Sequence, residues 1–144
     1  MAKYLMGIDA GTGSVRVALY DYRGQNRAYH IEDYATTYPK NGWAEQDDKG
    51  WWAAITKAIP ECMKKAGIGP ESVVAITCDA TTNTLVFLDE NGDSVRPPIL
   101  WMDVRATEEA AFIDEIRADY EATRFYKPSF RADTLIPKCM WLKK

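Results

Sequence analysis

The sequence is poor in histidine and cysteine, with a single histidine, His30, and three cysteines among 144 residues. His30 lies in a predicted strand, so the sequence disfavours catalysis by histidine and metal binding by a histidine cluster. The cysteines Cys62, Cys78 and Cys139 are far apart, odd in number and set among apolar residues. They predict reduced thiols in a core, and they argue against a disulfide framework and a zinc site.

Long apolar runs and an excess of basic residues are also missing. No apolar stretch is long enough to cross a bilayer, and the first residues lead into a predicted strand rather than the core of a signal peptide. The net charge of −3 argues against a nucleic acid or an anionic membrane as partner. The sequence therefore predicts a cytoplasmic protein with neither kind of partner.

The sequence does contain enough material for one globular domain. Its residues are 47% hydrophobic and 27% charged, which is ordinary for a chain with a packed core. The residue patterns predict strands over 4–10, 13–22, 26–32, 72–78 and 84–88, and helices over 49–66, 106–121 and 135–144. The strand over 72–78 is rich in Val and Ile, so we expect it to be buried. Because the sequence stops inside the last predicted helix, we expect the chain to be part of a longer protein.

The helix over 49–66 carries clear local signals. Asp47 or Asp48 is suited to cap its N-terminus, and Gly67 is suited to end it. Pro60 lies inside the helix and should bend or split it. The residues expected to face the core, by helical spacing, are Trp52, Ile55, Ile59, Cys62, Met63 and Ala66.

The most informative segment is the small-residue turn Gly11-Thr12-Gly13-Ser14, which follows Asp9 and lies between two apolar runs. Two glycines let the backbone approach a ligand closely and tolerate positive φ. Converging N–H groups and two hydroxyls can bind an oxyanion, and Asp9 suits a magnesium ion beside bound phosphates. The flanking apolar runs favour a β-hairpin over the strand-to-helix units of the P-loop and the dinucleotide fingerprint. An ordinary hairpin with a Gly-rich turn is the alternative.

Two further segments accompany this turn. One is Gly42-Trp43-Ala44-Glu45-Gln46-Asp47, followed by Trp51-Trp52. The other begins with Ala75-Ile76-Thr77-Cys78-Asp79-Ala80-Thr81 and continues to Arg96-Pro97-Pro98-Ile99-Leu100-Trp101-Met102-Asp103-Val104-Arg105-Ala106. Together with residues 7–16, these segments closely resemble the N-terminal domain of the FGGY carbohydrate kinases, the family that includes glycerol kinase, xylulokinase and the ribulokinases. The resemblance covers nearly the whole chain.

The resemblance implies an α/β fold of the actin-like ATPase, or ribonuclease H-like, type. In this fold a mixed sheet is flanked by helices, and ATP binds between two related domains. Residues 1–144 would be the N-terminal part of the first domain, incomplete at the C-terminus, with the second, ATP-binding domain absent. The resemblance also implies ATP and Mg²⁺ as cofactors, a small-molecule sugar as the partner, and a homodimer as one form of the full-length protein.

The resemblance assigns the phosphate side of the site to the N-terminal hairpin. Asp9 would be the metal-side carboxylate, and the turn from Gly11 to Ser14 would bind phosphate. Arg16 would lie near this turn on the following strand. No residue of this chain matches the catalytic base, which would lie beyond Lys144, so we expect the chain alone to be inactive.

The sugar side of the site would follow the strand over 72–78. Where glycerol kinase has an Arg-Glu pair and xylulokinase has a Met-His pair, this sequence has Thr82 and Asn83. The pattern of Asp79 and Thr81 is closer to the ribulokinase branch, which favours a ketopentose, ribulose or xylulose, over glycerol. Both Thr82 and Asn83 offer polar partners for sugar hydroxyls.

Trp101 and Asp103 match the family's Trp-x-Asp motif, which sits near the substrate cleft. These assignments have structural alternatives, since Asp79 can cap a strand end and Asp103 can be the N-terminal charge of a helix. For two of the tryptophans at 43, 51 and 52, packing is the better explanation than sugar stacking. Glu45 and Asp47 are on a loop, where a solvated or capping role is expected.

The predicted reaction is transfer of the γ-phosphoryl group of ATP to a hydroxyl of a small sugar, which needs positioning and charge stabilisation more than covalent help. Glycerol or another polyol is an alternative acceptor. A non-catalytic actin-like module that binds nucleotide is the alternative of another class. The Trp43 and Trp101 motifs argue against such a module, because it has no need of a sugar-pocket wall.

Overall fold

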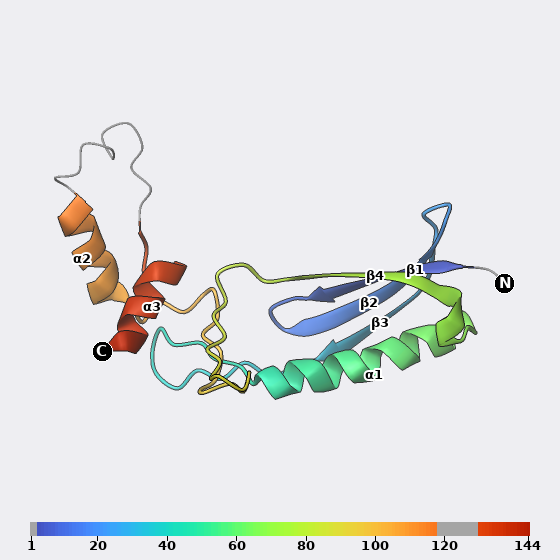
Figure 1. Ribbon diagram of the computed structural model, residues 1–144, viewed down its shortest axis with the longest axis horizontal. Helices are drawn as coiled ribbons and strands as arrows, with labels where there is room; N and C mark the ends of the chain where they lie inside the picture. Colours follow the sequence, from blue (N-terminus) through green and yellow to red (C-terminus); the bar gives the residue numbers. More distant parts are fainter. Residues whose placement is uncertain (1–2, 118–129) are drawn as a thin grey trace. The chain divides into compact units, whose positions relative to one another are not determined.

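The structure, a computed structural model, describes residues 3–117 and 130–144. Two compact units make up the chain: Met1–Thr36 with Asp47–Thr81, and Thr37–Gln46 with Thr82–Lys144. The first contains a sheet and a long helix, and the second contains loops and two shorter helices (Figure 1). None of the described helices is long and apolar enough to cross a membrane.

The first unit is built on a four-stranded sheet with the order β3-β2-β1-β4. Its strands are β1 (Tyr4–Ala10), β2 (Ser14–Asp21), β3 (Asn26–Asp33) and β4 (Val73–Ala80). The first three form an antiparallel meander, whereas β1 and β4 are parallel. The three predicted N-terminal strands are confirmed, and so is the predicted mixed sheet.

The connection from β3 to β4 contains α1 (Asp48–Ala66), as predicted. The side chain of Asp47 caps the N-terminus, and Gly67 ends the helix with a φ of 66°. Pro60 does not split α1. Because Pro60 and Thr56 are both exposed, water can solvate the Thr56 carbonyl group that loses its helical donor.

The core of the first unit lies between one face of the sheet and α1 (Figure 1). The residues buried there are Met6, Ile8, Val15, Val17, Leu19, Ala28, Ala54, Ala58 and Cys62. Most of the predicted helix face packs on this core. The prediction that Trp52 faces the core is wrong, because 67% of its surface is exposed. Trp52 lies two residues before Ala54, which is about 200° around the helix, so it points away from the sheet.

Strand β4 follows a short 3-10 helix (Pro70–Ser72) and is more exposed than its Val and Ile content predicts. Within the described residues it is an edge strand that pairs only with β1, while α1 packs mainly on β2 and β3. The prediction of a buried strand is therefore wrong for these residues. The prediction of core thiols holds for Cys62, whereas Cys78 on β4 and Cys139 are exposed.

The described part of the second unit has no regular strand. The predicted strand over 84–88 is instead represented by isolated bridges that join Leu85 to Ile99 and Leu88 to Ser94. Its helices are α2 (Thr107–Arg117) and α3 (Leu135–Lys143), which agree with two predicted helices. The remainder of the first of these predictions, residues 118–121, lies outside the described residues.

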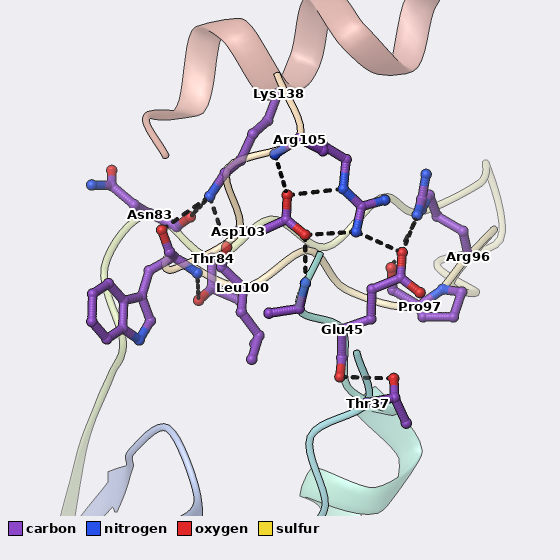
Figure 2. A network of polar contacts seen from close by, with 12 residues as sticks. Thr37, Glu45, Asn83, Thr84, Arg96, Pro97, Leu100, Asp103, Arg105 and Lys138 are labelled. Atoms are coloured by element: carbon purple, nitrogen blue, oxygen red, sulfur yellow. Dashed lines mark hydrogen bonds and ion pairs between the residues drawn. The ribbon is translucent and has the colours of Figure 1, made fainter. Parts of the chain in front are cut away.

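A buried ion pair between Asp103 and Arg105 organises the second unit (Figure 2). Oδ1 of Asp103 accepts hydrogen bonds from the backbone N–H and from Nε of Arg105, each at 2.9 Å. Oδ2 accepts from Nη2 of Arg105 at 2.7 Å and from the backbone N–H of Ala44 at 2.6 Å. Glu45 Oε1 lies 2.8 Å from Nη2 of Arg105 and 2.6 Å from Nη2 of Arg96. The network thus links two loops that are distant in sequence.

Arg105 also packs against two aromatic rings. Its guanidinium carbon lies 3.7 Å from the ring centroid of Trp43 and 4.8 Å from that of Trp141. The two rings meet edge to face, with centroids 5.3 Å apart. Trp43 is therefore packed, as its structural alternative requires. The solvated role expected for Glu45 is wrong, because two arginines pair with it and leave it 7% exposed.

The pKa of Asp103 reflects the balance of forces in this network. Burial raises the pKa, but hydrogen bonds from Arg105 and Ala44 and the charge of Arg105 lower it by more, so it lies below its ordinary value. A carboxyl group whose pKa is lowered on folding stabilises the protein above its unfolded pKa. That stabilisation is lost as the pH falls through the folded pKa.

We expect Asp103→Asn to lower the free energy of unfolding by about 3–5 kcal/mol at neutral pH, because the buried Arg105 loses Asp103 and keeps only Glu45, which it shares with Arg96. The difference from the wild type should shrink below about pH 4, where the carboxyl group is first protonated in the unfolded chain, and it is lost as the pH falls through the lower pKa of the folded protein. Denaturant titrations over a pH series measure both effects. Asp93→Asn, at an exposed turn, is the control and should change little. A difference that stays constant with pH would contradict this role of Asp103.

Candidate functional site

The predicted phosphate turn joins β1 to β2 and is held by its carbonyl groups. The N–H of Gly11 donates to the Ser14 carbonyl at 3.0 Å. The Tyr34 hydroxyl donates to the carbonyl oxygens of Gly11 and, at 3.1 Å, Ser14, while the Tyr34 N–H donates to the Gly13 carbonyl at 3.1 Å. Tyr34 therefore anchors the turn from the end of β3.

The pKa of Tyr34 keeps this anchor in its donor form. Burial raises the pKa of the phenol, and the negative charge of Asp9 raises it further, whereas Arg16 lowers it. With the pKa above its ordinary value, the hydroxyl stays protonated at neutral pH and can donate to the turn.

Gly11 leaves little room for a side chain. A Cβ at this position would lie 3.1 Å from Nη1 of Arg16 and 3.4 Å from the carbonyl oxygen of Ser14. Gly13, in contrast, has open space around it, and neither glycine has a positive φ. The close approach of this backbone to a ligand stays a prediction, while the tolerance of positive φ is not used in this turn.

Asp9 lies near the end of β1, opposite Arg16 of β2 in the antiparallel register. Nη1 of Arg16 is 2.9 Å from Oδ2 of Asp9, and the two side chains are 55% and 48% exposed. An exposed pair of this kind contributes about 1 kcal/mol or less to stability. Both groups can therefore exchange partners with a charged ligand at little cost to the fold.

Asp79 of β4 is the partner of Asp9 in the parallel register. Both carboxylates and Arg16 line an open hollow of about 670 Å³ on the sheet of the first unit. No cluster of three or more acidic, His or Cys side chains within residues 3–117 and 130–144 could hold a metal by itself. One or two carboxylates with room for water and phosphate are, however, the oxygen ligands that Mg²⁺ commonly takes. The residues present therefore fit magnesium bound together with a phosphate ligand.

The other predicted site residues lie in the second unit. Thr82 is exposed and Asn83 half-buried. Asn83 has a φ of 58°, in the left-handed region that asparagine tolerates better than most residues. Trp101 is 42% exposed, and its N–H donates to Oγ1 of Thr84 at 3.2 Å. Asp103 is fully buried with both oxygens bound inside the protein, which favours a structural role, in the pair with Arg105 and not as the charge at a helix N-terminus, over direct contact with a ligand.

Lys138 of α3 brings two of these residues together (Figure 2). Its Nζ donates to the carbonyl oxygens of Leu100 at 2.7 Å, Asn83 at 3.3 Å and Trp101 at 3.3 Å. The segments that carry Asn83 and Trp101 are therefore tied to one buried cation.

Reasoning from the sequence did not identify Tyr34 or Lys138. Lys138 is the one charged residue between Leu135 and Leu142, and this pattern was a signal for a buried cation. Tyr34 has no comparable signal, because its contacts to the turn depend on the pairing of β2 with β3.

Known carbohydrate kinases resemble this chain, two of the following in sequence and one in fold. A glycerol kinase of Alkaliphilus oremlandii (strain OhILAs) is 34% identical over 125 residues, which cover 83% of this chain and 24% of that protein. A xylulose kinase of Staphylococcus epidermidis is 30% identical over 141 residues, which cover 97% of this chain and 27% of that protein. The crystal structure of a gluconate kinase from Lactobacillus acidophilus matches with a TM-score of 0.87 at 26% identity, covering 100% of this chain and 29% of that one.

The chain spans about a quarter of the length of the curated relatives it matches. The structural match to carbohydrate kinases confirms the predicted fold class, a mixed sheet with helices of the actin-like ATPase type. Residues 4–144 match the model of the FGGY family of carbohydrate kinases, N-terminal domain. The chain therefore belongs to the FGGY family of carbohydrate kinases and carries that family's N-terminal domain.

Proposed function

We propose that the natural protein containing this chain transfers the γ-phosphoryl group of ATP to a hydroxyl of a small sugar. The observation that carries the proposal is the anchored turn of residues 11–14 with the exposed Asp9–Arg16 pair beside it, in a chain of the carbohydrate kinase family. Since ATP and free thiols are characteristic of the cytoplasm, we propose that the protein acts there.

On the phosphate side, the backbone of the turn and Arg16 would bind phosphate oxygens. The guanidinium group offers a planar pair of donors that matches phosphate geometry. Asp9, released from Arg16, would hold Mg²⁺ directly or through water. When bound, this ion would neutralise charge that develops on the phosphoryl group. Asp9 would be too weak a base beside a cation to accept the sugar proton, so we assign the catalytic base to a part of the protein outside these residues.

On the sugar side, Asp79, Thr82 and Asn83 would bind hydroxyl groups. A carboxylate accepts hydrogen bonds, whereas the hydroxyl and amide groups both donate and accept. Trp101 would present its exposed ring to the apolar face of the sugar. Asp103 would support the loop that carries Trp101. Asp79 and Asp9 are register partners that line one hollow of the first unit, so a hydroxyl bound by Asp79 would lie in the hollow that also takes the phosphate.

We propose a ketopentose, ribulose or xylulose, as the acceptor. The support is the neutral pair Thr82 and Asn83, which suits a substrate with several neutral hydroxyls. A xylulose kinase is among the relatives, but so are glycerol kinases of slightly higher identity. Glycerol is therefore the second candidate, favoured by identity alone.

A substrate panel on the natural protein tests this proposal. ATP-dependent phosphorylation should be fastest with ribulose or xylulose, and kcat/KM for the preferred ketopentose should exceed that for glycerol by about 100-fold or more, because polar groups left unpaired by glycerol are penalised strongly. Product formation is measured by coupled ADP release and by mass spectrometry. Residues 1–144 alone should show no turnover.

Three outcomes would contradict parts of this proposal. Faster turnover of glycerol would overturn the ketopentose assignment and keep the kinase. ATP binding without turnover of any sugar or polyol would favour the non-catalytic module. Turnover by residues 1–144 alone would show that the catalytic base lies within this chain.

We expect Asp9→Asn to lower kcat, because a charge that positions the metal in the transition state is lost. The activation free energy should rise by about 3–4 kcal/mol. The dependence of rate on magnesium concentration should weaken, while the Kd of the sugar stays nearly unchanged. Asp114→Asn, an exposed change on α2, is the matched control. Turnover of Asp9→Asn at the wild-type rate would contradict the assignment.

We expect Asn83→Gly to lower kcat/KM for the preferred sugar, because substrate hydroxyls lose a partner. The corresponding activation free energy should rise by about 1–3 kcal/mol. Glycine is the better test than alanine, since it adopts the φ of 58° without strain. The Kd of ATP should stay constant, as should all parameters of the control Asn91→Gly in an exposed turn. An unchanged kcat/KM in Asn83→Gly would remove Asn83 from the pocket.

A further inference from the structure

Lys138 of α3 is a charged residue at a buried position, between uncharged neighbours in the sequence. Its side chain is fully buried, and its Nζ donates to three carbonyl oxygens, those of Asn83, Leu100 and Trp101. An ammonium group has three donors, so this set of acceptors uses its full capacity. Within the described residues no carboxylate forms an ion pair with it.

Burying the charged ammonium group of a lysine without a carboxylate partner costs desolvation free energy. Burial lowers the pKa of Lys138, the charges of Asp103 and Asp133 raise it, and the charge of Arg105 lowers it. An apolar side chain of similar length would avoid this desolvation. It would also leave three carbonyl groups without their donor, so the cation both stabilises these segments and fixes where their backbones lie.

The three acceptors show what the cation accomplishes. Asn83 is held in a left-handed conformation at the end of the segment that leaves β4, and Trp101 lies on a loop 18 positions further along. The ammonium group of Lys138 binds a backbone carbonyl of each of these two segments. The N–H of Trp101 donates to Thr84, which closes the contact between the two segments from the other side.

We propose that Lys138 is a positioning residue for the acceptor sugar, which fixes the side chains of Asn83 and Trp101 by holding their carbonyl groups. The inference rests on the proposed function, because it takes these two side chains as the wall of the sugar pocket. Lys138 itself touches no substrate, since its three donors are already used within the protein.

The test compares Lys138→Met with Lys143→Met in the natural protein. Methionine keeps the length and the apolar stem but removes all three donors, whereas Lys143 is an exposed lysine of the same helix. For Lys138→Met we expect kcat/KM for the preferred sugar to fall about 10- to 100-fold, as when reacting groups are slightly misplaced. The KM of ATP should stay at the wild-type value, and Lys143→Met should match the wild type throughout.

Lys138→Arg provides a second variant if Lys138→Met does not fold. Arginine keeps the charge and the donors, but its planar fork cannot converge on three carbonyls as an ammonium does. Its kcat/KM for the sugar should lie between those of the wild type and the methionine variant, or below the wild type if the methionine variant is lost. If both variants fold and both have the sugar parameters of the wild type, the inference is overturned. If only Lys138→Arg folds, sugar parameters equal to the wild type in that variant overturn it. So would a rise in the KM of ATP equal to that of the sugar.

The same experiment separates this inference from the proposed function. If the wild-type protein phosphorylates no sugar, the proposed function has failed. If the wild type phosphorylates a sugar and the lysine variants keep its sugar parameters, only the role of Lys138 has failed.

Discussion

The parallel pairing of β1 with β4 is the constraint on which the candidate site depends. Parallel strands need a long crossover, and α1 supplies it while covering the apolar face of the sheet. The same pairing brings the carboxyl ends of both strands to one edge, where Asp9 and Asp79 become register partners. A one-residue slip would turn either carboxylate to the other face of the sheet. The register is in turn specified by the apolar residues that β1 and β2 direct toward α1.

The second unit is held together differently, by cations buried among polar backbone groups and aromatic rings. Its described residues form isolated bridges in place of a regular sheet. Hydrogen bonds and ion pairs of Arg105 and Lys138 take the place of hydrogen bonds between strands. Each of these side chains binds acceptors from segments that are distant in sequence. Such groups specify one arrangement of loops, since any other leaves a buried charge without partners. A loop wall fixed in this way suits the recognition of a small polar ligand.

Much of this architecture could be predicted from the sequence. The strands over 4–10, 13–22 and 26–32, and the helix that Gly67 ends, follow from local periodicity and capping, and the structure confirms them. The proximity of Arg16 to the turn also follows, because two residues of a hairpin are close in sequence and in space. These features depend on neighbours within a few residues, which is the range over which a single sequence is informative.

What the sequence did not reveal about Glu45, Lys138 and β4 depends on residues that are distant in sequence. Glu45 is paired with arginines at least 51 positions away, and Lys138 with carbonyl groups 37 to 55 positions upstream, so no local pattern reveals their partners. Strand β4 looks buried because its composition is apolar, but exposure depends on which elements pack on it, and α1 packs mainly on β2 and β3. Residue type predicts how a side chain prefers to be solvated, whereas its partners are set by topology.

The Asp9–Arg16 and Asp103–Arg105 ion pairs differ in their exposure to solvent, and the difference matches the roles proposed for them. The Asp9–Arg16 pair is about half exposed, so its partners are screened by water and can be exchanged for phosphate or metal. The Asp103–Arg105 pair is fully buried with every carboxylate lone pair directed at a donor, and breaking it leaves a charge without water. A binding group must release its internal partner when the ligand arrives, and a supporting group must keep it. Exposure therefore separates residues suited to meet a ligand from those suited to hold the wall around it.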